Sequence, residues 1–421
     1  MKVFKFGGAS VKDAEAIKNV GSILLRFEKE PIVVIVSAMG KTTNKLEEVL
    51  KYWSEKNELK FNHIVDELHD FHSEIAGALF HARHHKVFNF IDERFETLKN
   101  KFDKPMAEHL PFEYDQMVSL GEVLSSFIIA EYLVEIGLKA KWIDARRLVR
   151  TDNHYQEGKV QWEKTEQLIR HQIPGSDKET DKWVTQGFVG HTAEGFTTTL
   201  GREGSDYSAA IFAYGLNAEE VTIWKDVPGM LNADPKYFEN TKLLSEISYR
   251  EAIELAYFGA SVIHPKTIKP LQNKAIPLHV KSFIQPEEPG TVIQSAGSKD
   301  HLIPSFIMKK NQCLLSISAT DFAFINEEAL SNLFEVFYSF RVTVQLMQNS
   351  ALNFSTLIDP QKVDIDALRE ALLPAFECRY NLGVELVTIR HYDEATIRQV
   401  IGDREVLLEQ RSRQTARFVV R

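Results

Sequence analysis

A run of apolar residues near the N-terminus constrains the fold of this chain more than any other feature. Residues 31–40 read PIVVIVSAMG, with a β-branched side chain at every position from Ile32 to Val36. A strand that is apolar on both faces is typical of a parallel sheet covered by helices on each side. The residues before it repeat at helical spacing, with one stripe formed by Ile17, Val20, Leu24 and Phe27. The N-terminal region is therefore expected to be a layered α/β domain.

The same alternation of strand-like and helix-like segments continues to about residue 290. Further strands are expected at residues 140–145, 183–189, 221–227 and 277–283, and helices at residues 117–136, 205–214 and 249–258. Residues 57–104 interrupt the pattern as a helical excursion that is rich in histidine, with His63, His69, His72, His81, His84 and His85. Their spacing permits a metal site, but no cysteine accompanies them, and a solvated helical surface is the favoured interpretation. We predict one domain over residues 1–295.

A stretch rich in proline and glycine at residues 285–299 predicts a linker. Beyond it, strands are expected at residues 314–317, 342–347, 354–358 and 383–389, and helices at residues 328–340 and 366–373. This βαββαβ order is the ferredoxin-like split unit. Two further short strands, around residues 396–401 and 405–420, would form a truncated second unit. We therefore predict a second region over residues 300–421, with one full unit and part of another.

Composition narrows the classes of function. The chain has 421 residues, of which 44% are hydrophobic and 26% charged, as in an ordinary globular protein. Its net charge of -9 argues against nucleic acid or an anionic membrane as the main partner. The two cysteines lie far apart in sequence and fit a reducing cytoplasm. The first residues form a predicted strand rather than a secretory leader, and no apolar run is expected to be long enough to cross a bilayer.

Four polar, glycine-bearing segments follow predicted strands, where ligands of open α/β sheets bind. They are residues 5–8 (KFGG), 37–44 (SAMGKTTN), 197–206 (TTTLGREGSD) and 224–236 (WKDVPGMLNADPK). In the third segment, Arg202 can bind a carboxylate through two parallel hydrogen bonds. Ser205 is expected to cap a helix whose N-terminus favours an anion. A capping turn without a ligand is the structural alternative, and the combination of hydroxyls, arginine and glycines favours a ligand site.

Lys5, beside Gly7 and Gly8, supplies a mobile positive charge that suits a phosphoryl group. The chain has neither the Walker A spacing nor a GxGxxG motif with a partner acid. If the reaction is phosphoryl transfer, scattered strand-end groups and magnesium must do the work that a P-loop does elsewhere.

The chain resembles the aspartokinases, within the wider amino-acid kinase family, in a series of motifs: KFGGASV, VSAMGKTTN, SLGE, TQGFVG, TTTLGREGSDYSAA, IWKDVPG and YFGASVIHPKTI. The resemblance implies a three-layer αβα amino-acid kinase fold with a mainly parallel sheet, followed by a ferredoxin-like ACT-type regulatory region. It implies an enzyme that uses ATP and Mg²⁺ to convert L-aspartate into 4-phospho-L-aspartate. This is the first step toward lysine, threonine and methionine.

The resemblance also implies roles for individual residues. The catalytic positions are Lys5 and Asp206. The substrate-binding positions are Ser37, Thr43, Glu122, Phe188, Arg202 and Ser205, and the ATP-binding positions are Gly7, Gly8, Ser10, Lys225, Asp226, Leu231, Lys236 and Ser261. No protein ligand for the metal is implied, since Mg²⁺ would be held mainly by the ATP phosphates. Arg202 would clamp the substrate α-carboxylate and Glu122 would receive its ammonium, while the ionised side-chain carboxylate attacks without a general base.

Several positions depart from the family pattern. Ala9 and Lys225 each replace a threonine, Leu231 a tyrosine, Lys236 an arginine, and Ser261 a lysine. We hypothesise that Lys225 supplies the positive charge that is missing at Ser261.

The resemblance implies a lysine or threonine effector, with expected contacts at Asn349 and Ser350, and a homodimer or higher homo-oligomer formed through the ACT-like region. Alternatives are a kinase for another amino acid, a catalytically silent sensor of amino acid or nucleotide, and the kinase half of a bifunctional aspartokinase–homoserine dehydrogenase. The presence of Lys5, Asp206, Arg202 and Glu122 favours an active kinase, and no Rossmann fingerprint follows the kinase region.

Overall fold

The computed structural model describes residues 1–82, 84–174, 180–260, 262–295, 300, 303–321, 323–373 and 375–421. The chain divides into two compact units. Unit 1 comprises residues 1–230, 243–256 and 261–300, and unit 2 comprises residues 231–242, 257–260 and 301–421. Two short segments from within the first 295 residues therefore group with the C-terminal region.

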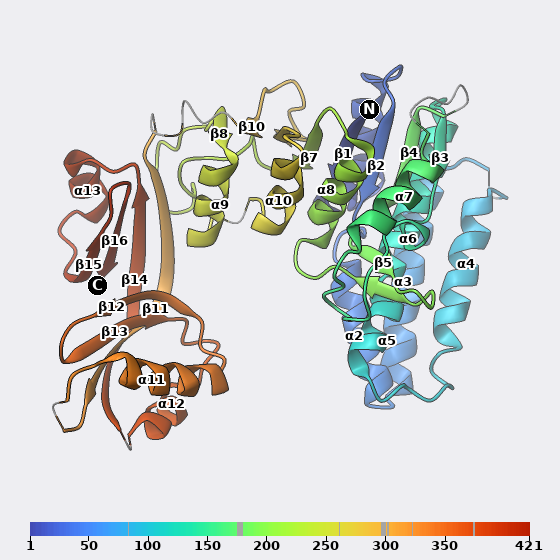
Figure 1. Ribbon diagram of the computed structural model, residues 1–421. Coiled ribbons are helices and arrows are strands. Elements are labelled where there is room, and N and C mark those ends of the chain that lie inside the picture. The colour runs from blue at the N-terminus through green and yellow to red at the C-terminus, as the bar shows by residue number, and fades with distance from the viewer. Residues whose placement is uncertain are drawn as a thin grey trace. The chain divides into compact units, whose positions relative to one another are not determined.

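Unit 1 is built on a mainly parallel sheet (Figure 1). Its strand order is β3 (Ala140–Trp142), β4 (Lys182–Gln186), β2 (Ile32–Val36), β1 (Lys2–Phe6), β7 (Val221–Lys225), β9 (Leu278–Ser282), β10 (Thr291–Gln294) and β8 (Glu246–Ser248). In this order, all neighbouring strands from β3 through β9 run parallel to each other, whereas β10 runs antiparallel to β9. Each residue of β2 is buried, as its continuous apolar run predicts.

Helices cover both faces of this sheet. Phe4 and Phe6 of β1 join the core with α1 (Ala14–Leu25) and α6 (Leu120–Glu135). Side chains of a strand alternate between faces, so Lys5 points to the other side. There α8 (Gly204–Leu216) packs on β1, β2 and β7, flanked by α7 (Trp162–Gln172) and α10 (Pro265–Asn273). The layered α/β class predicted from the sequence is confirmed.

The histidine-rich region forms helices, as expected. It includes α3 (Glu58–Leu79) and α4 (Lys86–Lys99), which pack with α2 (Thr42–Ser54) and α6. His72 is fully buried and its Nδ1 lies 2.7 Å from the carbonyl oxygen of Leu68. Burial lowers the pKa of His72 to about 4. His69 instead pairs with Asp92 at the surface at 2.8 Å. In the described ranges, no group of three or more potential ligands is arranged to hold a metal ion.

Helices α5 (Leu110–Val118) and α6 form a long apolar stretch, Leu110–Glu135. By length and composition it is sufficient to cross a membrane, so the expectation that no apolar run has this length is wrong. However, 83% of its most apolar window is buried inside the protein. The stretch therefore has the burial of a core helix.

Unit 2 is built on an antiparallel sheet with the strand order β12 (Val344–Asn349), β13 (Asn353–Ile358), β11 (Ser305–Ala319), β14 (Phe376–Arg390), β16 (Thr415–Val420) and β15 (Val406–Arg411). The long strands β11 and β14 pair along most of their length, with an irregularity at Gln312. One half of the sheet packs with α11 (Glu327–Ser339) and α12 (Ile365–Leu372). This half contains the predicted βαββαβ order, and the expectation of a ferredoxin-like region is confirmed.

The other half of the unit 2 sheet differs from the prediction. The expected strand at residues 396–401 is wrong, because these residues form α13 (Glu394–Ile401). Asp393 caps this helix by accepting a hydrogen bond from the Thr396 N–H at 2.7 Å. Ile397 and Ile401 lie one turn apart and are both buried. Residues 405–420 form the β15–β16 hairpin rather than one strand.

The remaining elements of the described chain connect these layers. They are η1 (Gly8–Val11), η2 (Ala145–Arg147), the hairpin of β5 (Val189–His191) and β6 (Thr197–Thr199), and α9 (Tyr249–Phe258).

Candidate active site

The ends of β1 and β2 approach each other closely at Gly8. The N–H of Gly40 donates to the carbonyl oxygen of Gly8 at 3.2 Å. A Cβ at residue 8 would lie 2.9 Å from the carbonyl oxygen of Ala38. Glycine at this position therefore allows the two strand-end loops to form one wall of a pocket.

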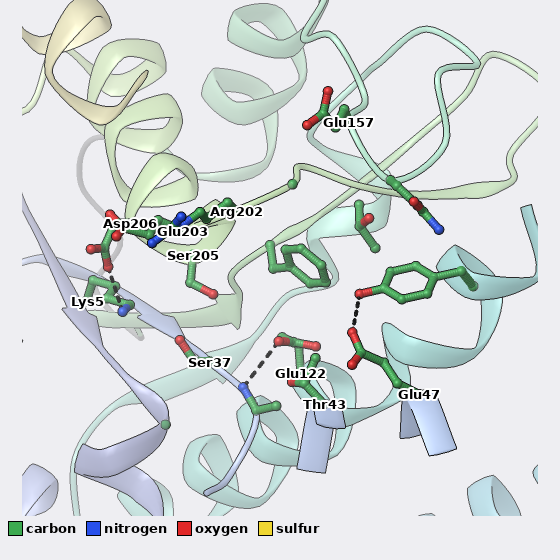
Figure 2. Close-up of a pocket in the computed structure, with 18 of the residues that line it drawn as sticks. Lys5, Ser37, Thr43, Glu47, Glu122, Glu157, Arg202, Glu203, Ser205 and Asp206 are labelled. Carbon is green, nitrogen blue, oxygen red and sulfur yellow. Dashed lines mark hydrogen bonds and ion pairs between the residues drawn. The ribbon is translucent and has the colours of Figure 1, made fainter. Parts of the chain in front are cut away.

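Two lysines share one buried carboxylate at the carboxyl end of the sheet. Lys5 Nζ, on β1, lies 2.6 Å from Asp206 Oδ1, which belongs to the first turn of α8. Lys225 Nζ, at the end of β7, lies 3.2 Å from Asp206 Oδ2. We call Lys5, Asp206 and Lys225 the catalytic triplet, a name that anticipates the role proposed for them below. Figure 2 shows Lys5 and Asp206 meeting across the sheet–helix boundary.

Charge within the catalytic triplet keeps the carboxylate ionised. Burial by itself would raise the pKa of Asp206, but the charges of Lys5 and then Lys225 outweigh it and hold that pKa below its usual range. Lys225 also donates to the carbonyl oxygen of Val262. Both ammonium groups are therefore held at defined positions beside the pocket.

The backbone that leads into α8 is unusual. Glu203 at the N-cap position has φ 53°, and Phe188 has φ 68°. A Cβ at residue 204 would lie 2.6 Å from the Phe188 ring, so glycine at this position allows the start of α8 to approach Phe188 closely. The expectation that Ser205 caps this helix is wrong, because α8 already begins at Gly204. Left-handed non-glycine residues of this kind concentrate at functional sites.

Glu122 contributes an incompletely satisfied carboxylate to the same pocket. Its side chain is on α6 and only 3% exposed. Oε1 accepts a long hydrogen bond of 3.4 Å from the Ala38 N–H, whereas Oε2 has no hydrogen-bond partner among the described residues. Burial raises the pKa of Glu122 to about 8. A ligand ammonium would satisfy this oxygen and ionise the group.

Arg202 supplies the opposite charge. It is exposed, lines the pocket, and pairs with none of the acidic side chains that the structure describes. Figure 2 shows Arg202 and Ser205 on one side of the pocket and Ser37 and Glu122 on the other. A cation, a buried acid and the two lysines therefore surround one space, which suits a ligand with a carboxylate, an ammonium and a second anionic group.

This space is a pocket of about 980 Å³. Of the residues predicted from the sequence, its lining includes Lys5, Gly8, Ser37, Thr43, Glu122, Phe188, Arg202, Ser205, Asp206 and Lys225. Among the predicted ATP positions, five are not in the lining: Gly7, Ser10, Asp226, Leu231 and Lys236. Leu231 and Lys236 belong to unit 2. Ser261 lies outside the described residues. Asn349 and Ser350 lie at the end of β12 in unit 2 and in the turn that follows.

One wall of the pocket was not predicted. It consists of Glu47, Tyr114 and residues 154–157, and it meets the predicted segment 197–206 at Thr199. Asp115, which is fully buried, holds this wall together by accepting hydrogen bonds from the Gln156 N–H and the Thr199 N–H, both at 2.9 Å. Tyr114 donates to Glu47 at 2.7 Å (Figure 2). The sequence signal for this wall was only a polar, glycine-terminated turn between predicted elements.

Comparison with known proteins identifies the family. Residues 1–282 match the amino acid kinase family. Aspartokinase 1 of Arabidopsis thaliana, a chloroplastic protein, is 32% identical over 379 residues, covering 86% of this chain. The chain spans 64% of the length of that relative, a little under two thirds. Lysine-sensitive aspartokinase 3 of Escherichia coli is 30% identical, and the match covers 85% of this chain and 78% of that protein.

Solved structures agree with the sequence relatives. Aspartokinase III of E. coli in complex with lysine and aspartate has a TM-score of 0.81 at 25% identity, covering 100% of this chain and 96% of that one. The same enzyme in complex with aspartate and ADP has a TM-score of 0.78 at 26% identity, with the same coverage. The match thus extends over the described parts of both units. The chain belongs to the amino acid kinase family and, within it, to the aspartokinases.

Proposed function

We propose that this chain phosphorylates the side-chain carboxylate of L-aspartate with ATP, yielding 4-phospho-L-aspartate and ADP. The observation that carries the proposal is the arrangement of Arg202 and the unpaired Glu122 oxygen around a pocket that also contains the catalytic triplet. This set of charges matches a free amino acid with a second carboxylate. An N-acetylated substrate has no ammonium to satisfy Glu122, which argues against it.

The groups divide the work of the reaction. Arg202 binds the α-carboxylate and Glu122 the ammonium, so the substrate's own side-chain carboxylate points at the catalytic triplet. That carboxylate is ionised at neutral pH and attacks the terminal phosphorus directly. Lys5 offsets the charge that is shared between the two reacting anions, and Asp206 holds Lys5 in place. Catalysis then rests on positioning and electrostatic stabilisation rather than on a general base.

ATP is the proposed phosphoryl donor, in keeping with the relative that was solved with ADP. Magnesium bound to the ATP phosphates would offset their charge. The donor set fits a metal that arrives with the nucleotide, since two lysines already occupy the oxygens of Asp206. Lys225 is proposed as a second cation on the donor side. Gly7, Gly8, Ser10, Asp226, Leu231, Lys236 and Ser261 complete the proposed ATP positions.

Regulation and assembly form the second part of the proposal. We propose that residues 300–421 form a regulatory region with one full ACT-type unit and a truncated second one. A lysine or threonine effector would contact Asn349 and Ser350, in keeping with the relative that was solved with lysine. Assembly into a homodimer through this region, and a cytoplasmic location, are also proposed.

The test is a substrate panel with ATP, Mg²⁺ and hydroxylamine, which traps an acyl phosphate as its hydroxamate. L-aspartate, L-glutamate, N-acetyl-L-aspartate and succinate are compared, each with and without lysine and threonine. Hydroxamate is expected from L-aspartate, and removal of the ammonium or its acetylation is expected to abolish it. Equal turnover of succinate and aspartate would contradict the role of Glu122, and no hydroxamate at all would leave the chain as a silent sensor.

A further inference from the structure

Unit 2 contains a second cavity, of about 540 Å³. Its walls come from residues 232–233 and 237–241, from the first half of β11, from β14, from the end of α13 and from Arg404. All of these residues belong to unit 2. We call it the unit 2 cavity and define it by Tyr237, Phe306, Met308, Lys310, Glu385 and Arg404. The roles proposed above leave it unexplained.

A carboxylate between two cations forms the polar side of the unit 2 cavity. Arg404 Nη1 lies 3.2 Å from Glu385 Oε2. Arg404 also donates from Nε to the carbonyl oxygen of Ile401 at 3.0 Å, which fixes its guanidinium. Lys310 Nζ lies 3.9 Å from Glu385 Oε1, too far for a hydrogen bond, and 4.5 Å from the centre of the Tyr237 ring. Lys310 therefore retains hydrogen-bond donors that face the cavity.

The other side of the unit 2 cavity is apolar. Phe306 packs against Phe238 with ring centres 5.5 Å apart, and Met308 and Val400 complete this surface. Apolar surface beside a cation, an acid and a second cation is the chemistry that recognises a small zwitterion with an apolar side chain.

We infer that the unit 2 cavity binds a free α-amino acid with an apolar side chain. The carboxylate pairs with Lys310, the ammonium pairs with Glu385, and the side chain packs on Phe306 and Met308. The site is distinct from the expected effector contacts at Asn349 and Ser350, neither of which lines this cavity.

Two proposed ATP positions, Leu231 and Lys236, belong to the same chain segment as part of the cavity wall, although neither lines the cavity. Residues 231–242 belong to unit 2, whereas Met230 and Leu243 on either side belong to unit 1. The two ends of this segment are hydrogen-bonded to each other, since the Asn232 N–H donates to the Lys242 carbonyl oxygen at 2.9 Å. It is tied to β11 because the Phe306 N–H donates to the Asn232 carbonyl oxygen at 2.7 Å. A ligand that stabilises this segment changes the affinity for ATP, and ATP changes the affinity for the ligand by the same factor.

Binding is tested by isothermal titration calorimetry on the full chain without ATP or aspartate. The probes are L-leucine, the 2-oxo acid that lacks its ammonium, and the amine that lacks its carboxylate. L-leucine is expected to bind, with each truncated probe weaker by about tenfold or more, since each loses a charge-assisted contact. Lys310→Met and Glu385→Gln are each expected to lower the affinity for L-leucine by a similar factor. Lys362→Met is the matched control, because the exposed Lys362 side chain pairs with Asp359 at 3.7 Å and with no other acidic side chain in the described part of the chain.

The coupling is tested by repeating the titration with saturating ATP, and by titrating ATP into the chain with and without saturating L-leucine. The factor by which ATP changes the affinity for L-leucine is expected to equal the factor by which L-leucine changes the affinity for ATP. No heat from L-leucine, L-methionine or L-phenylalanine up to about 10 mM, or unaltered L-leucine binding by Lys310→Met, would overturn the inference. The coupling rests on the proposed function, but the binding arm does not. If the chain binds L-leucine but forms no hydroxamate, only the proposed kinase activity is therefore refuted.

Discussion

Each unit holds a carboxylate between two cations, and the two arrangements differ in burial. In the catalytic triplet, Asp206 is 3% exposed and its lysines lie at 2.6 and 3.2 Å. In the unit 2 cavity, the side chain of Glu385 is 27% exposed, and its cations lie at 3.2 and 3.9 Å. Coulomb interactions strengthen as water is excluded. The same charge pattern can therefore serve transition-state stabilisation in one unit and reversible ligand binding in the other.

The largest expected difference between the two arrangements is in stability. Asp206→Asn leaves the buried Lys5 and the partly buried Lys225 as uncompensated charges, and is expected to lower the free energy of unfolding by about 3–5 kcal/mol. Glu385→Gln removes a solvated group and is expected to cost less than about 1 kcal/mol. Denaturant unfolding of the two variants measures both values. If both variants lose the same free energy of unfolding, burial does not distinguish the two sites.

A second prediction contrasts the two acids of the catalytic pocket. Asp206 has two lysine partners and a lowered pKa, whereas burial raises the pKa of Glu122 to about 8. Below pH 8, the free enzyme must therefore lose a proton from Glu122 before it binds the substrate ammonium. The Michaelis constant for aspartate is expected to rise by up to about tenfold per pH unit as the pH falls from 8 to 6.

The matched control for this prediction is Glu122→Gln. It is expected to raise the Michaelis constant for aspartate at pH 8 and to flatten its pH dependence. A wild-type profile that is flat between pH 6 and 8 would show that Glu122 is already ionised in the free enzyme.

A smaller effect is expected for the second lysine of the catalytic triplet. Lys225→Met leaves Lys5 on Asp206 and is expected to lower kcat/KM for ATP by about tenfold, the loss of one charge-assisted contact. Lys225→Arg is expected to restore part of that loss. Lys310→Met, the corresponding change in unit 2, is expected to leave the kinetics unchanged in the absence of a ligand. An unaltered kcat/KM for ATP in Lys225→Met would refute the idea that Lys225 replaces the missing lysine at Ser261.

Local sequence pattern was sufficient to predict an element whose buried residues follow one regular pattern. The apolar run of β2 and the Tyr249–Phe258 helix were predicted in this way. Helix α13 was misread because half of its eight residues are β-branched, as in strands, and only the cap at Asp393 and the one-turn spacing of its isoleucines reveal the helix. Helix α10 was missed because Pro270 lies inside it. Helix α7 was missed because only Thr165 and Ile169 are buried in it.

The candidate site was predictable to the extent that its residues lie in strand-end motifs. Lys5, Arg202 and Asp206 follow predicted strands and meet in one pocket. The wall at residues 154–157 depends instead on the buried carboxylate of Asp115, which joins segments far apart in sequence. No local pattern encodes such a contact, and the unit 2 cavity escaped prediction for the same reason.

The central claim is that Lys5 promotes phosphoryl transfer to the side-chain carboxylate of L-aspartate. Its most direct test is the initial rate of aspartyl hydroxamate formation by the wild-type chain and by Lys5→Met, with Lys362→Met as a surface control. We predict hydroxamate formation that requires ATP and aspartate, a loss of about 10²–10³-fold in Lys5→Met, and no change in the control. A wild-type chain that forms no aspartyl hydroxamate, or a Lys5→Met variant with an unaltered rate, would contradict the account.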